Sequence, residues 1–551
     1  MRKVKKLLGL LLAAVMVLAM GVPTFAASGE YTITINNALA GHTYQAYQVF
    51  AGDLSENEET LSNVTWGDGV DGTAILTALK GTEEETTAYE NCTTAADVAK
   101  VLETYGENSS EMKAFADIVG QHLTETTSGT LSAYNSENQS YTISGLAAGY
   151  YFIKDADTVA ETDAYTDFIL KLTNDETITR KADVPTVEKK VQEDDKDITN
   201  GENENYGEGY NDVADWNIGD AVPFKLIGTL PTNFADYDTY QYIFHDTLSA
   251  GLDLNEESIA VYYASDKAGT DKTSISSDNY TIHVPGTEDA DQCSFEVAFA
   301  DLTSVEGVNA EKYIIVEYTA TLKTSAEIGL PGNPNRVYLE FSNNPNSGGE
   351  GDTGETPEDK VIVFTYELDV TKVDGKDANT KLEDAEFKLY DANGKYVIVD
   401  DEGKVTGWAD NEEGGSTLKS GEDGLFKVIG LDDGTYWLKE TKSPDGYNLI
   451  TDPIKIEIKA TTVNDQEWTA MEGPSDALTA LEIKVTVGST TTSGNGDTES
   501  GIVETDIKNN KGAELPETGG MGTTIFYVLG AILVLGAGVL LIARRRTDSE
   551  K

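Results

Sequence analysis

The sequence contains little cysteine, little histidine and few basic residues. Its 551 residues include 2 Cys, 4 His and 40 Lys or Arg, against 96 Asp or Glu, and the formal net charge is −56. Two cysteines cannot build a disulfide framework. So large an acidic excess excludes a nucleic-acid-binding surface, which needs Lys and Arg to neutralise phosphates. The sequence also lacks the HExxH, GxSxG and P-loop motifs, so we expect no independent enzyme activity, no metal and no cofactor.

The residues that are present indicate a folded β protein. The chain has 27 Tyr, and apolar residues alternate with polar ones in many short segments, such as 31–35. This alternation is typical of strands with one buried face, whereas an acidic disordered chain would have few aromatic residues. At about 100–200 residues per domain, the length predicts about three domains. We interpret the acidic excess as a solvated exterior that keeps the protein soluble outside the cell.

The amino-terminal end predicts secretion. Residues 1–27 begin with basic side chains, continue with an uncharged apolar run from Leu7 to Val22, and end in small residues at Ala26 and Ala27. This is the layout of a signal peptide cleaved after about Ala27. A retained membrane anchor is the alternative, but the apolar run is short for a membrane span.

The carboxyl-terminal end carries a short motif, a membrane span and a basic cluster, in that order. The motif consists of Leu515, Pro516, Glu517, Thr518 and Gly519. Uncharged residues 521–543 follow, long enough to cross a bilayer, and then three arginines that hold this end in the cytoplasm. The motif resembles the LPxTG sorting signal of Gram-positive surface proteins. In that family a sortase cysteine attacks the carbonyl of the threonine, here Thr518, and releases the residues from Gly519 onward.

The mature chain is expected to contain three β modules. Their predicted bounds are 28–182, 183–345 and 358–510, with 346–357 as a linker rich in Gly, Asn and acidic residues, and 511–551 as the anchor. Apolar residues between 94 and 123 recur at three- and four-residue steps, which predicts short helices inserted in the first module. Elsewhere, short strands separated by turn residues favour β-sandwiches, so the predicted fold class is all-β.

Two further features receive a plain structural interpretation. Segment 195–201 resembles a calcium loop, but its glycine stands at the seventh place and not the sixth, which favours a solvated turn. Cys92 and Cys293 fall in different predicted modules and are expected to be unpaired.

Several segments resemble the backbone pilins of Gram-positive bacteria. Residues 41–52 and 61–67 are similar to the first domain of these pilins, and residues 185–191 and 338–345 to the first and last strands of their middle domain. Residues 436–447 resemble the E-box of pilin domains built on the collagen-adhesin B-type (CnaB) sandwich. The resemblance implies tandem Ig-like, CnaB-like sandwiches in the shaft subunit of a sortase-assembled pilus.

The resemblance also implies amide crosslinks inside the modules, between a Lys of the first strand and an Asn of the last. In the third module these residues are Lys372 and Asn509, with Glu440 as the catalytic acid. A Lys amine attacks only when it is neutral, and burial in an apolar core lowers its pKa. Burial raises the pKa of a carboxyl group, so a protonated acid can polarise the carboxamide and move protons. Ammonia then leaves, and no cofactor is required.

In the second module the implied pair is Lys189 and Asn343. Strand alternation places each of them on the inward, apolar face of its own strand. For the acid we favour Asp246, and Glu317 is the alternative.

The first module has no Lys in its opening strand, so we predict no crosslink there and the lowest stability of the three modules. Between subunits, the resemblance implies that Thr518 is joined to a Lys near the end of the next subunit's first domain. The Tyr-Pro-Lys motif that is usual at this place is missing. Lys181 is the first choice for this acceptor, Lys190, on the outward face of its predicted strand, is the second, and Lys171 is the third.

The sequence therefore predicts a structural shaft pilin, anchored to the peptidoglycan of a Gram-positive bacterium. The implied partners are a pilin-class sortase, identical pilin subunits and minor or tip pilins. The alternative is a wall-anchored adhesin or a tip pilin that binds host matrix. A large non-repeated head after the signal peptide would favour that alternative, but all three predicted modules resemble a stalk.

Overall fold

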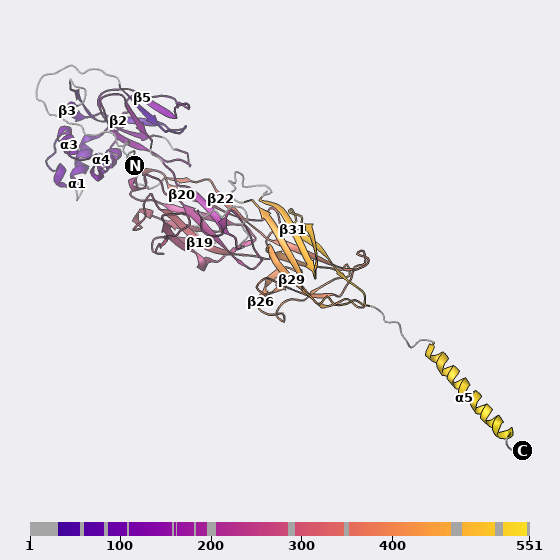
Figure 1. Cartoon of the computed structure of the whole chain (residues 1–551). Coiled ribbons are helices and arrows are strands. Elements are labelled where there is room, and N and C mark those ends of the chain that lie inside the picture. The colour runs from indigo at the N-terminus through magenta and orange to yellow at the C-terminus, as the bar shows by residue number, and fades with distance from the viewer. Residues whose placement is uncertain are drawn as a thin grey trace, which may run out of the picture.

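Three β modules follow one another along an elongated molecule, and a single helix lies beyond them at the carboxyl-terminal end (Figure 1). The computed structural model describes residues 31–55, 60–81, 86–106, 109–156, 159–160, 162–180, 183–194, 205–284, 293–345, 352–463, 477–512 and 522–547. The signal peptide, the sorting motif 515–519, the segment 195–201 and Lys181 lie outside the described residues.

The first module contains two four-stranded sheets, with the orders β4-β5-β1-β8 and β3-β2-β6-β7. Their strands are β1 (Tyr31–Asn36), β2 (Tyr44–Leu54), β3 (Leu61–Trp66), β4 (Thr130–Leu131), β5 (Ser140–Leu146), β6 (Gly149–Asp155), β7 (Asp167–Leu172) and β8 (Glu176–Thr179). The apolar face of β1 is formed by Ile33 and Ile35, which are fully buried, as the alternation of the sequence predicts.

In the described part of this module, four helices are inserted: α1 (Gly72–Gly81), α2 (Thr86–Tyr89), α3 (Ala95–Leu102) and α4 (Ser110–Gln121). The predicted helical region is confirmed by α3 and α4. A capping box between Thr94 and Asp97 starts α3, because each side chain accepts a hydrogen bond from the other residue's backbone N–H. The sequence did not predict α1, which has only two buried apolar side chains, Ile75 and Leu79, or α2, which has four residues.

The second module is a sandwich of two seven-stranded sheets. One sheet has the order β10-β9-β12-β19-β15-β16, with β14 paired to β19; the other has the order β11-β22-β20-β13-β18-β17, with β21 paired to β20. The strands of the first sheet are β9 (Val187–Gln192), β10 (Tyr210–Asn211), β12 (Ala221–Gly228), β14 (Leu252–Leu254), β15 (Ala260–Ala264), β16 (Thr273–Ser274) and β19 (Tyr313–Leu322). Those of the second are β11 (Val213–Asp215), β13 (Tyr242–Leu248), β17 (Thr281–His283), β18 (Phe295–Phe299), β20 (Asn333–Ser342), β21 (Thr353–Glu355) and β22 (Asp359–Phe364). Short 3-10 helices are η1 (Phe234–Asp236), η2 (Glu256–Ser258) and η3 (Leu302–Ser304).

The expected linker 346–357 is wrong in the part that the structure describes. Strand β21 lies within it and pairs with β20, and the following strand β22 pairs with both β20 and β11 in the same sheet. The second module therefore extends to Phe364, not to residue 345. The segment was predicted to be a linker because it is rich in Gly and Asn. Strand β21 has only three residues, which is too short for an alternating pattern to indicate a strand.

The third module has a three-stranded sheet, β28-β23-β33, and an eight-stranded sheet, β26-β25-β24-β29-β30-β31-β32 with β27 paired to β24. Its strands are β23 (Tyr366–Asp374), β24 (Glu386–Tyr390), β25 (Tyr396–Val399), β26 (Val405–Ala409), β27 (Leu418–Lys419), β28 (Leu425–Leu431), β29 (Gly434–Lys442), β30 (Ile454–Thr462), β31 (Leu478–Val487), β32 (Thr490–Asn495) and β33 (Ile502–Asn509). The first and last strands, β23 and β33, are parallel neighbours.

The second and third modules share one continuous hydrophobic core. Across their boundary, the Tyr366 hydroxyl donates a 2.8 Å hydrogen bond to Asp215, and the Ile218 N–H donates a 2.9 Å bond to the carbonyl of Gly430. Gly329 and Gly501 touch at the same boundary, and a Cβ on Gly329 would lie 2.3 Å from the backbone nitrogen of Gly501. Both glycines have positive φ, so a side chain at either position would be excluded by contact and by conformation.

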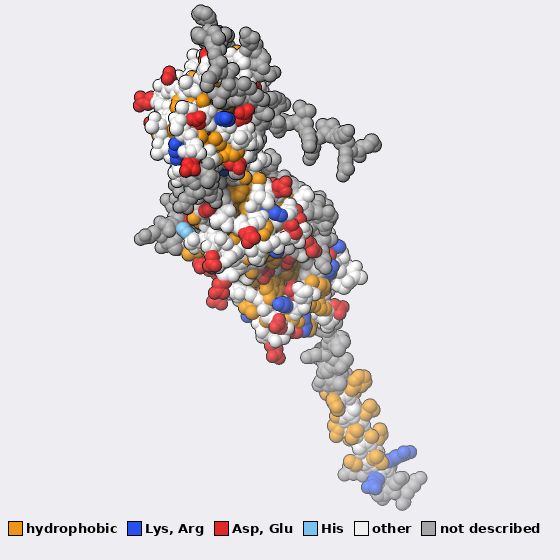
Figure 2. Space-filling model, turned by 90° about the vertical axis from the view of Figure 1, so that its left-hand side faces the viewer, with side chains coloured by type: hydrophobic (Ala, Val, Ile, Leu, Met, Phe, Trp, Pro, Cys, Tyr) orange, Lys and Arg blue, Asp and Glu red, His pale blue; other side chains and the backbone are white. Residues whose placement is uncertain are grey.

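The helix α5 (Gly522–Thr547) matches the predicted membrane span. Its 20-residue segment Phe526–Arg545, apolar up to the two arginines at its end, is long enough and apolar enough to cross a bilayer. Its apolar side chains are exposed along its length, whereas acidic side chains are scattered over the visible face of the three β modules (Figure 2).

Candidate functional site

The three residues expected to form a crosslink in the third module meet in its core. Lys372 Nζ of β23 donates a 2.6 Å hydrogen bond to Asn509 Oδ1 at the end of β33. Glu440 of β29, in the facing sheet, lies 3.0 Å from Lys372 Nζ and accepts a 3.0 Å hydrogen bond from Asn509 Nδ2. All three residues are buried. One carboxylate therefore contacts both the amine and the amide nitrogen that would leave.

The Lys372 amine also lies beside an aromatic ring. Its Nζ lies 5.2 Å from the centre of the Phe387 ring. Burial lowers the pKa of Lys372, and the neighbouring Glu440 carboxylate offsets this only in part. The amine is thus easier to deprotonate than a lysine in water, which is what nucleophilic attack requires.

In the second module a second buried lysine lies beside an acid. Lys189 Nζ of β9 contacts Asp246 Oδ2 of β13 and donates a 2.9 Å hydrogen bond to the Tyr318 hydroxyl, which in turn donates to Asp246 at 2.9 Å. Burial lowers the pKa of Lys189 to about 8 against the opposing effect of Asp246, and burial raises the pKa of Asp246. The alternative acid, Glu317, faces outward and pairs with Lys272 at 2.6 Å.

The predicted partner Asn343 is wrong, because it lies at the other end of the module. Its Nδ2 donates a 3.2 Å hydrogen bond to the carbonyl of Asp163, and its own carbonyl accepts a 2.8 Å bond from the N–H of Tyr165. Asn343 therefore joins the second module to the first. The buried carboxamide near Lys189 belongs to Asn335 of β20, eight residues earlier, whose Nδ2 donates a 2.7 Å bond to the Tyr318 hydroxyl.

Strand register explains this correction. Asn335 and Asn343 have the same phase along the chain, so alternation alone cannot distinguish them. Strand β20 pairs with β13 so that Val337 lies opposite Asp246 and Asn335 lies opposite Leu248. Leu248 is two residues after Asp246 on β13, so Asn335 lies on the same face of the sheet as the acid. The Oδ1 atom of Asn335 is buried without a hydrogen-bond partner. A carboxamide at this position is thus incompletely satisfied in the uncrosslinked arrangement.

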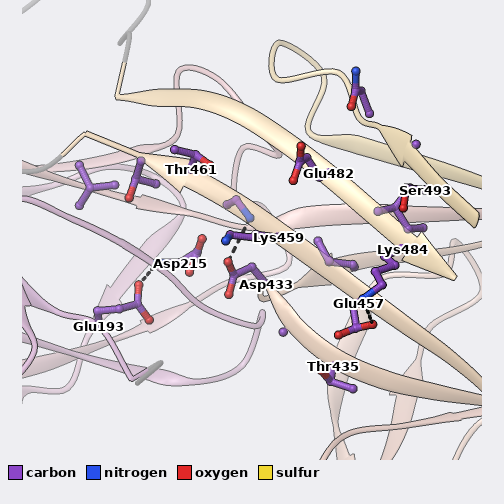
Figure 3. A pocket seen from close by; sticks show the side chains of 18 of the residues that line it. Glu193, Asp215, Asp433, Thr435, Glu457, Lys459, Thr461, Glu482, Lys484 and Ser493 are labelled. Carbon is purple, nitrogen blue, oxygen red and sulfur yellow. Dashed lines mark hydrogen bonds and ion pairs between the residues drawn. The ribbon is translucent and has the colours of Figure 1, made fainter. Parts of the chain in front are cut away.

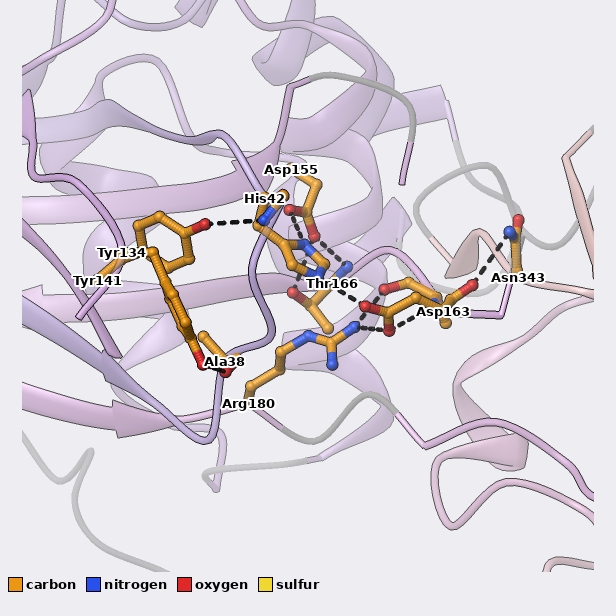
Figure 4. Close-up of polar contacts among 11 residues, drawn as sticks. Ala38, His42, Tyr134, Tyr141, Asp155, Asp163, Thr166, Arg180 and Asn343 are labelled. Atoms are coloured by element: carbon orange, nitrogen blue, oxygen red, sulfur yellow. Dashed lines mark hydrogen bonds and ion pairs between the residues drawn. The ribbon is translucent and has the colours of Figure 1, made fainter. Parts of the chain in front are cut away.

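The first module contains a buried ionic network, which the sequence did not predict. His42 Nδ1 lies 2.6 Å from Asp155, His42 Nε2 lies 2.8 Å from Asp163, and the Arg180 guanidinium contacts Asp163 as well (Figure 4). Burial alone would lower the pKa of His42, but hydrogen bonds with the two carboxylates outweigh it and raise the pKa to about 9. These residues are far apart in the chain and form no short motif.

The lysines considered as acceptors differ in their accessibility. Lys190 was expected on an outward face, but it is buried: its Nζ is paired with Asp212 and lies 4.7 Å from the centre of the Tyr206 ring. Tyr206 and Asp212 of the same module cover this side of β9, so the expectation that Lys190 faces outward is wrong. Lys171 is half-buried in β7. Lys181 follows Arg180 directly, and Arg180 is buried and donates a 2.6 Å bond to the carbonyl of Ala164.

A polar cavity of about 650 Å³ lies where the second and third modules meet. Asp215 of the second module and Asp433 of the third face the same space, beside Glu193 and close to Lys459 (Figure 3). A carboxylate oxygen of Asp432 lies within 4.8 Å of those of Asp215 and Asp433, and burial raises the pKa of Asp432 well above the usual range. Protonated carboxyl groups can lie this close together, whereas charged ones would repel each other.

The two cysteines are buried and not joined to each other, as predicted. Cys92 lies in the helical part of the first module, and Cys293 lies in the second.

Comparisons with known proteins agree with this architecture. Residues 366–471 match the model of the SpaA prealbumin-like fold domain, and residues 507–549 match the LPXTG cell wall anchor motif. The trypsin-resistant surface T6 protein of Streptococcus pyogenes serotype M6 is 24% identical over 93% of this chain and 95% of its own. The fimbrial subunit type 1 of Actinomyces viscosus is 30% identical over 22% of this chain and 17% of its own.

The solved structure of the T6 backbone pilin of serotype M6 S. pyogenes, described as a modular three-domain structure, superposes with a TM-score of 0.50. It covers 89% of this chain and all of that one, at 19% identity, and it supports the fold described here. The SpaA-type match begins at the first residue of β23, where the structure places the start of the third module. The chain is therefore a cell-wall-anchored surface protein of the Gram-positive type, similar along most of its length to the T6 surface protein and, in its fold, to the T6 backbone pilin.

Proposed function

We propose that this chain is polymerised by a sortase into a pilus shaft, and that amide bonds inside two of its modules strengthen that shaft. The observation that carries the proposal is the contact of Lys372, Glu440 and Asn509 in the module next to the anchor. Lys372 lies on the first strand of that module and Asn509 on its last, and Glu440 of β29 contacts both. No separate enzyme or cofactor is needed for these internal bonds.

In the third module, the neutral Lys372 amine attacks the side-chain carbonyl carbon of Asn509. Glu440 accepts the proton that the amine loses and delivers one to the amide nitrogen, which leaves as ammonia. The distances support these roles, because Glu440 is within 3.0 Å of both nitrogens. The product is an amide bond between the two side chains.

In the second module, Lys189 and Asn335 would be joined in the same way, with Asp246 as the acid. Tyr318 supports this assignment because its hydroxyl is hydrogen-bonded to Lys189, Asp246 and Asn335. Attack moves the Lys189 amine from the Tyr318 hydroxyl toward Asn335, and Asp246 carries the proton to the leaving ammonia.

Between subunits, the acyl group of Thr518 would be transferred by a pilin-class sortase to Lys181 of the next subunit. Burial of Arg180 fixes the chain immediately before Lys181 at the end of the first module. Lys171 is second, since Lys190 is already buried in an ion pair. Identical subunits, minor or tip pilins and peptidoglycan are the further partners of this assembly.

The test is an SDS gel of cell-wall extracts. Wild-type cells should give a ladder of high-molecular-weight bands, and Thr518→Ala should abolish it. Lys181→Ala should leave single subunits, whereas Lys190→Ala, the matched control, should keep the ladder. One discrete wall-linked band from wild-type cells would contradict polymerisation and favour a monomeric adhesin.

A further inference from the structure

A row of metal-ligating side chains crosses one sheet of the second module. His283 of β17, Glu296 of β18 and His245 of β13 lie directly opposite one another on adjacent strands. Cys293 stands two residues before β18. The whole chain has four histidines and two cysteines. Two of those histidines and one of those cysteines therefore gather at one place that the pilin assembly does not use.

The ligand atoms of three of these residues converge. His245 Nδ1 lies 3.3 Å from Glu296 Oε1, Cys293 Sγ lies 3.4 Å from the same oxygen, and Sγ and Nδ1 are 3.9 Å apart. In a tetrahedral zinc site with bonds of about 2.0–2.3 Å, neighbouring ligand atoms are separated by roughly 3.3–3.6 Å. Two of the three separations fall in that range, and the third needs an adjustment of a few tenths of an ångström.

Burial distinguishes this cluster from a set of surface side chains. His245, Cys293 and Glu296 are exposed by only 3%, 6% and 3%. The neighbouring residues Phe244 and Asp246 point into the module core, so the cluster lies on the opposite face of the sheet. His283 is more accessible, and its Nδ1 lies 3.4 Å from the second oxygen of Glu296, so it contacts the carboxylate from the side away from the three converging ligand atoms.

The other nitrogen of His245 is held by an outer carboxylate. His245 Nε2 lies 3.3 Å from Glu340 Oε2, and the imidazole stacks on Tyr338 with ring centres 4.4 Å apart. A carboxylate on the far nitrogen of a ligating histidine fixes the ring and its tautomer and leaves the near nitrogen as an electron-pair donor. Glu340 in turn accepts a 2.9 Å hydrogen bond from Gln241.

We propose that His245, Cys293 and Glu296, with a water as the fourth ligand, bind a divalent transition-metal ion, with zinc as the best match. Thiolate and imidazole ligands select zinc and related metals over calcium and magnesium, which prefer oxygen. Binding replaces the thiol proton of Cys293, which is released to solvent. The ion would fasten the β17–β18 hairpin to β13. The sequence contains no metal-binding motif here, because His245 lies 48 residues before Cys293 and joins Cys293 and Glu296 only through strand pairing.

Cobalt is the probe, because Co²⁺ occupies zinc sites and a bound thiolate gives it a charge-transfer band in the near ultraviolet. The full chain, in detergent with reductant and freed of metal by a chelator, is titrated with Co²⁺ and then with Zn²⁺. We expect one equivalent of Co²⁺ to produce the band, and Zn²⁺ to abolish it and raise the melting temperature. A wild-type chain without the band would overturn the proposal.

The two cysteines provide the matched comparison. Cys293→Ser should eliminate the band, and Cys92→Ser, a substitution of the other buried cysteine, should preserve it. Persistence of the band in Cys293→Ser, or its loss in Cys92→Ser, would overturn the assignment. Intact mass and a melting curve establish that each variant is folded. If Cys293→Ser does not fold, Glu340→Gln decides: metal affinity should fall about 10–100-fold, and unchanged affinity refutes the site.

Discussion

Replacement of Glu440 by glutamine should prevent the crosslink of the third module while keeping the shape of its core. The glutamine side chain can still occupy the space between Lys372 and Asn509, but it cannot carry a proton from one nitrogen to the other. Each bond removes one ammonia, about 17 Da, so two bonds leave the wild-type chain roughly 34 Da below its sequence mass. Glu440→Gln should halve that deficit.

The loss of stability can be estimated from the loop that the bond closes. Lys372 and Asn509 are separated by 137 residues. The loop-entropy model for crosslinks gives about 5 kcal/mol for a loop of this length. For a module of about 150 residues, each kcal/mol corresponds to roughly 2–4 °C, so the melting temperature of the third module should fall by about 10–20 °C.

The assays are intact-mass spectrometry and differential scanning calorimetry on the same preparation. The control is Glu386→Gln, which removes the same charge from a partly exposed pair between Glu386 of β24 and Lys442 of the neighbouring strand β29. An exposed pair of this kind contributes little, so mass deficit and melting temperature should hardly change. If Glu440→Gln retained the full deficit, Glu440 would not be the catalyst. If the wild-type mass equalled the sequence mass, the internal bonds would not exist.

Three further predictions concern the other modules and the boundary between them. Asn335→Ala should reduce the mass deficit by about 17 Da, whereas Asn343→Ala should leave it unchanged, and the reverse result would restore the sequence-based pair. The charged form of His42 should stabilise the first module by at most about 3 kcal/mol. This stabilisation is fully present below the unfolded pKa near 6.5 and is lost as the pH rises through the folded pKa of about 9. The melting temperature of that module should therefore fall over this pH interval in the wild type but not in His42→Gln. Because the folded pKa of Asp432 is raised, the stability that its protonated form contributes is fully present below an unfolded pKa of about 3.9 and is lost as the pH rises through the folded pKa. Asp432→Asn puts an uncharged side chain at this position at every pH, so it should raise the melting temperature at pH 7. A lower melting temperature at pH 7 would contradict this.

The sequence predicted what depends on local patterns. Alternation identified the strands and the inward faces, and the third-module residues were assigned from the resemblance of their segments to those of pilin domains. The wrong choice of Asn343 shows what such patterns cannot determine. Period-two alternation determines which face a residue occupies but not its depth along the strand, and only the pairing of Val337 with Asp246 selects Asn335.

The remaining features depend on contacts between distant strands. His42, Asp155, Asp163 and Arg180 are brought together by the fold, with no spacing that marks them in the sequence. His245 and Glu296 stand on the polar phase of their strands, and this pattern usually indicates solvent exposure. Strand pairing makes them neighbours, so their chemistry becomes visible only in three dimensions.

The positions of the two proposed bonds give the modules different resistance to pulling. In the third module the chain enters β23 at Tyr366, and force would cross to Asn509 after six residues, so nearly all of the module lies outside the load path. In the second module, a bond at Asn335 leaves the rest of β20 and all of β22 under load before the chain reaches Tyr366. That unprotected segment is the part that pairs with β11 and β13 and shares its core with the third module. The continuous core at this boundary therefore stabilises the stretch of chain that neither bond shields, whereas the first module, with no lysine in its first strand, is held only by non-covalent contacts, namely its two hydrophobic clusters and its buried ionic network.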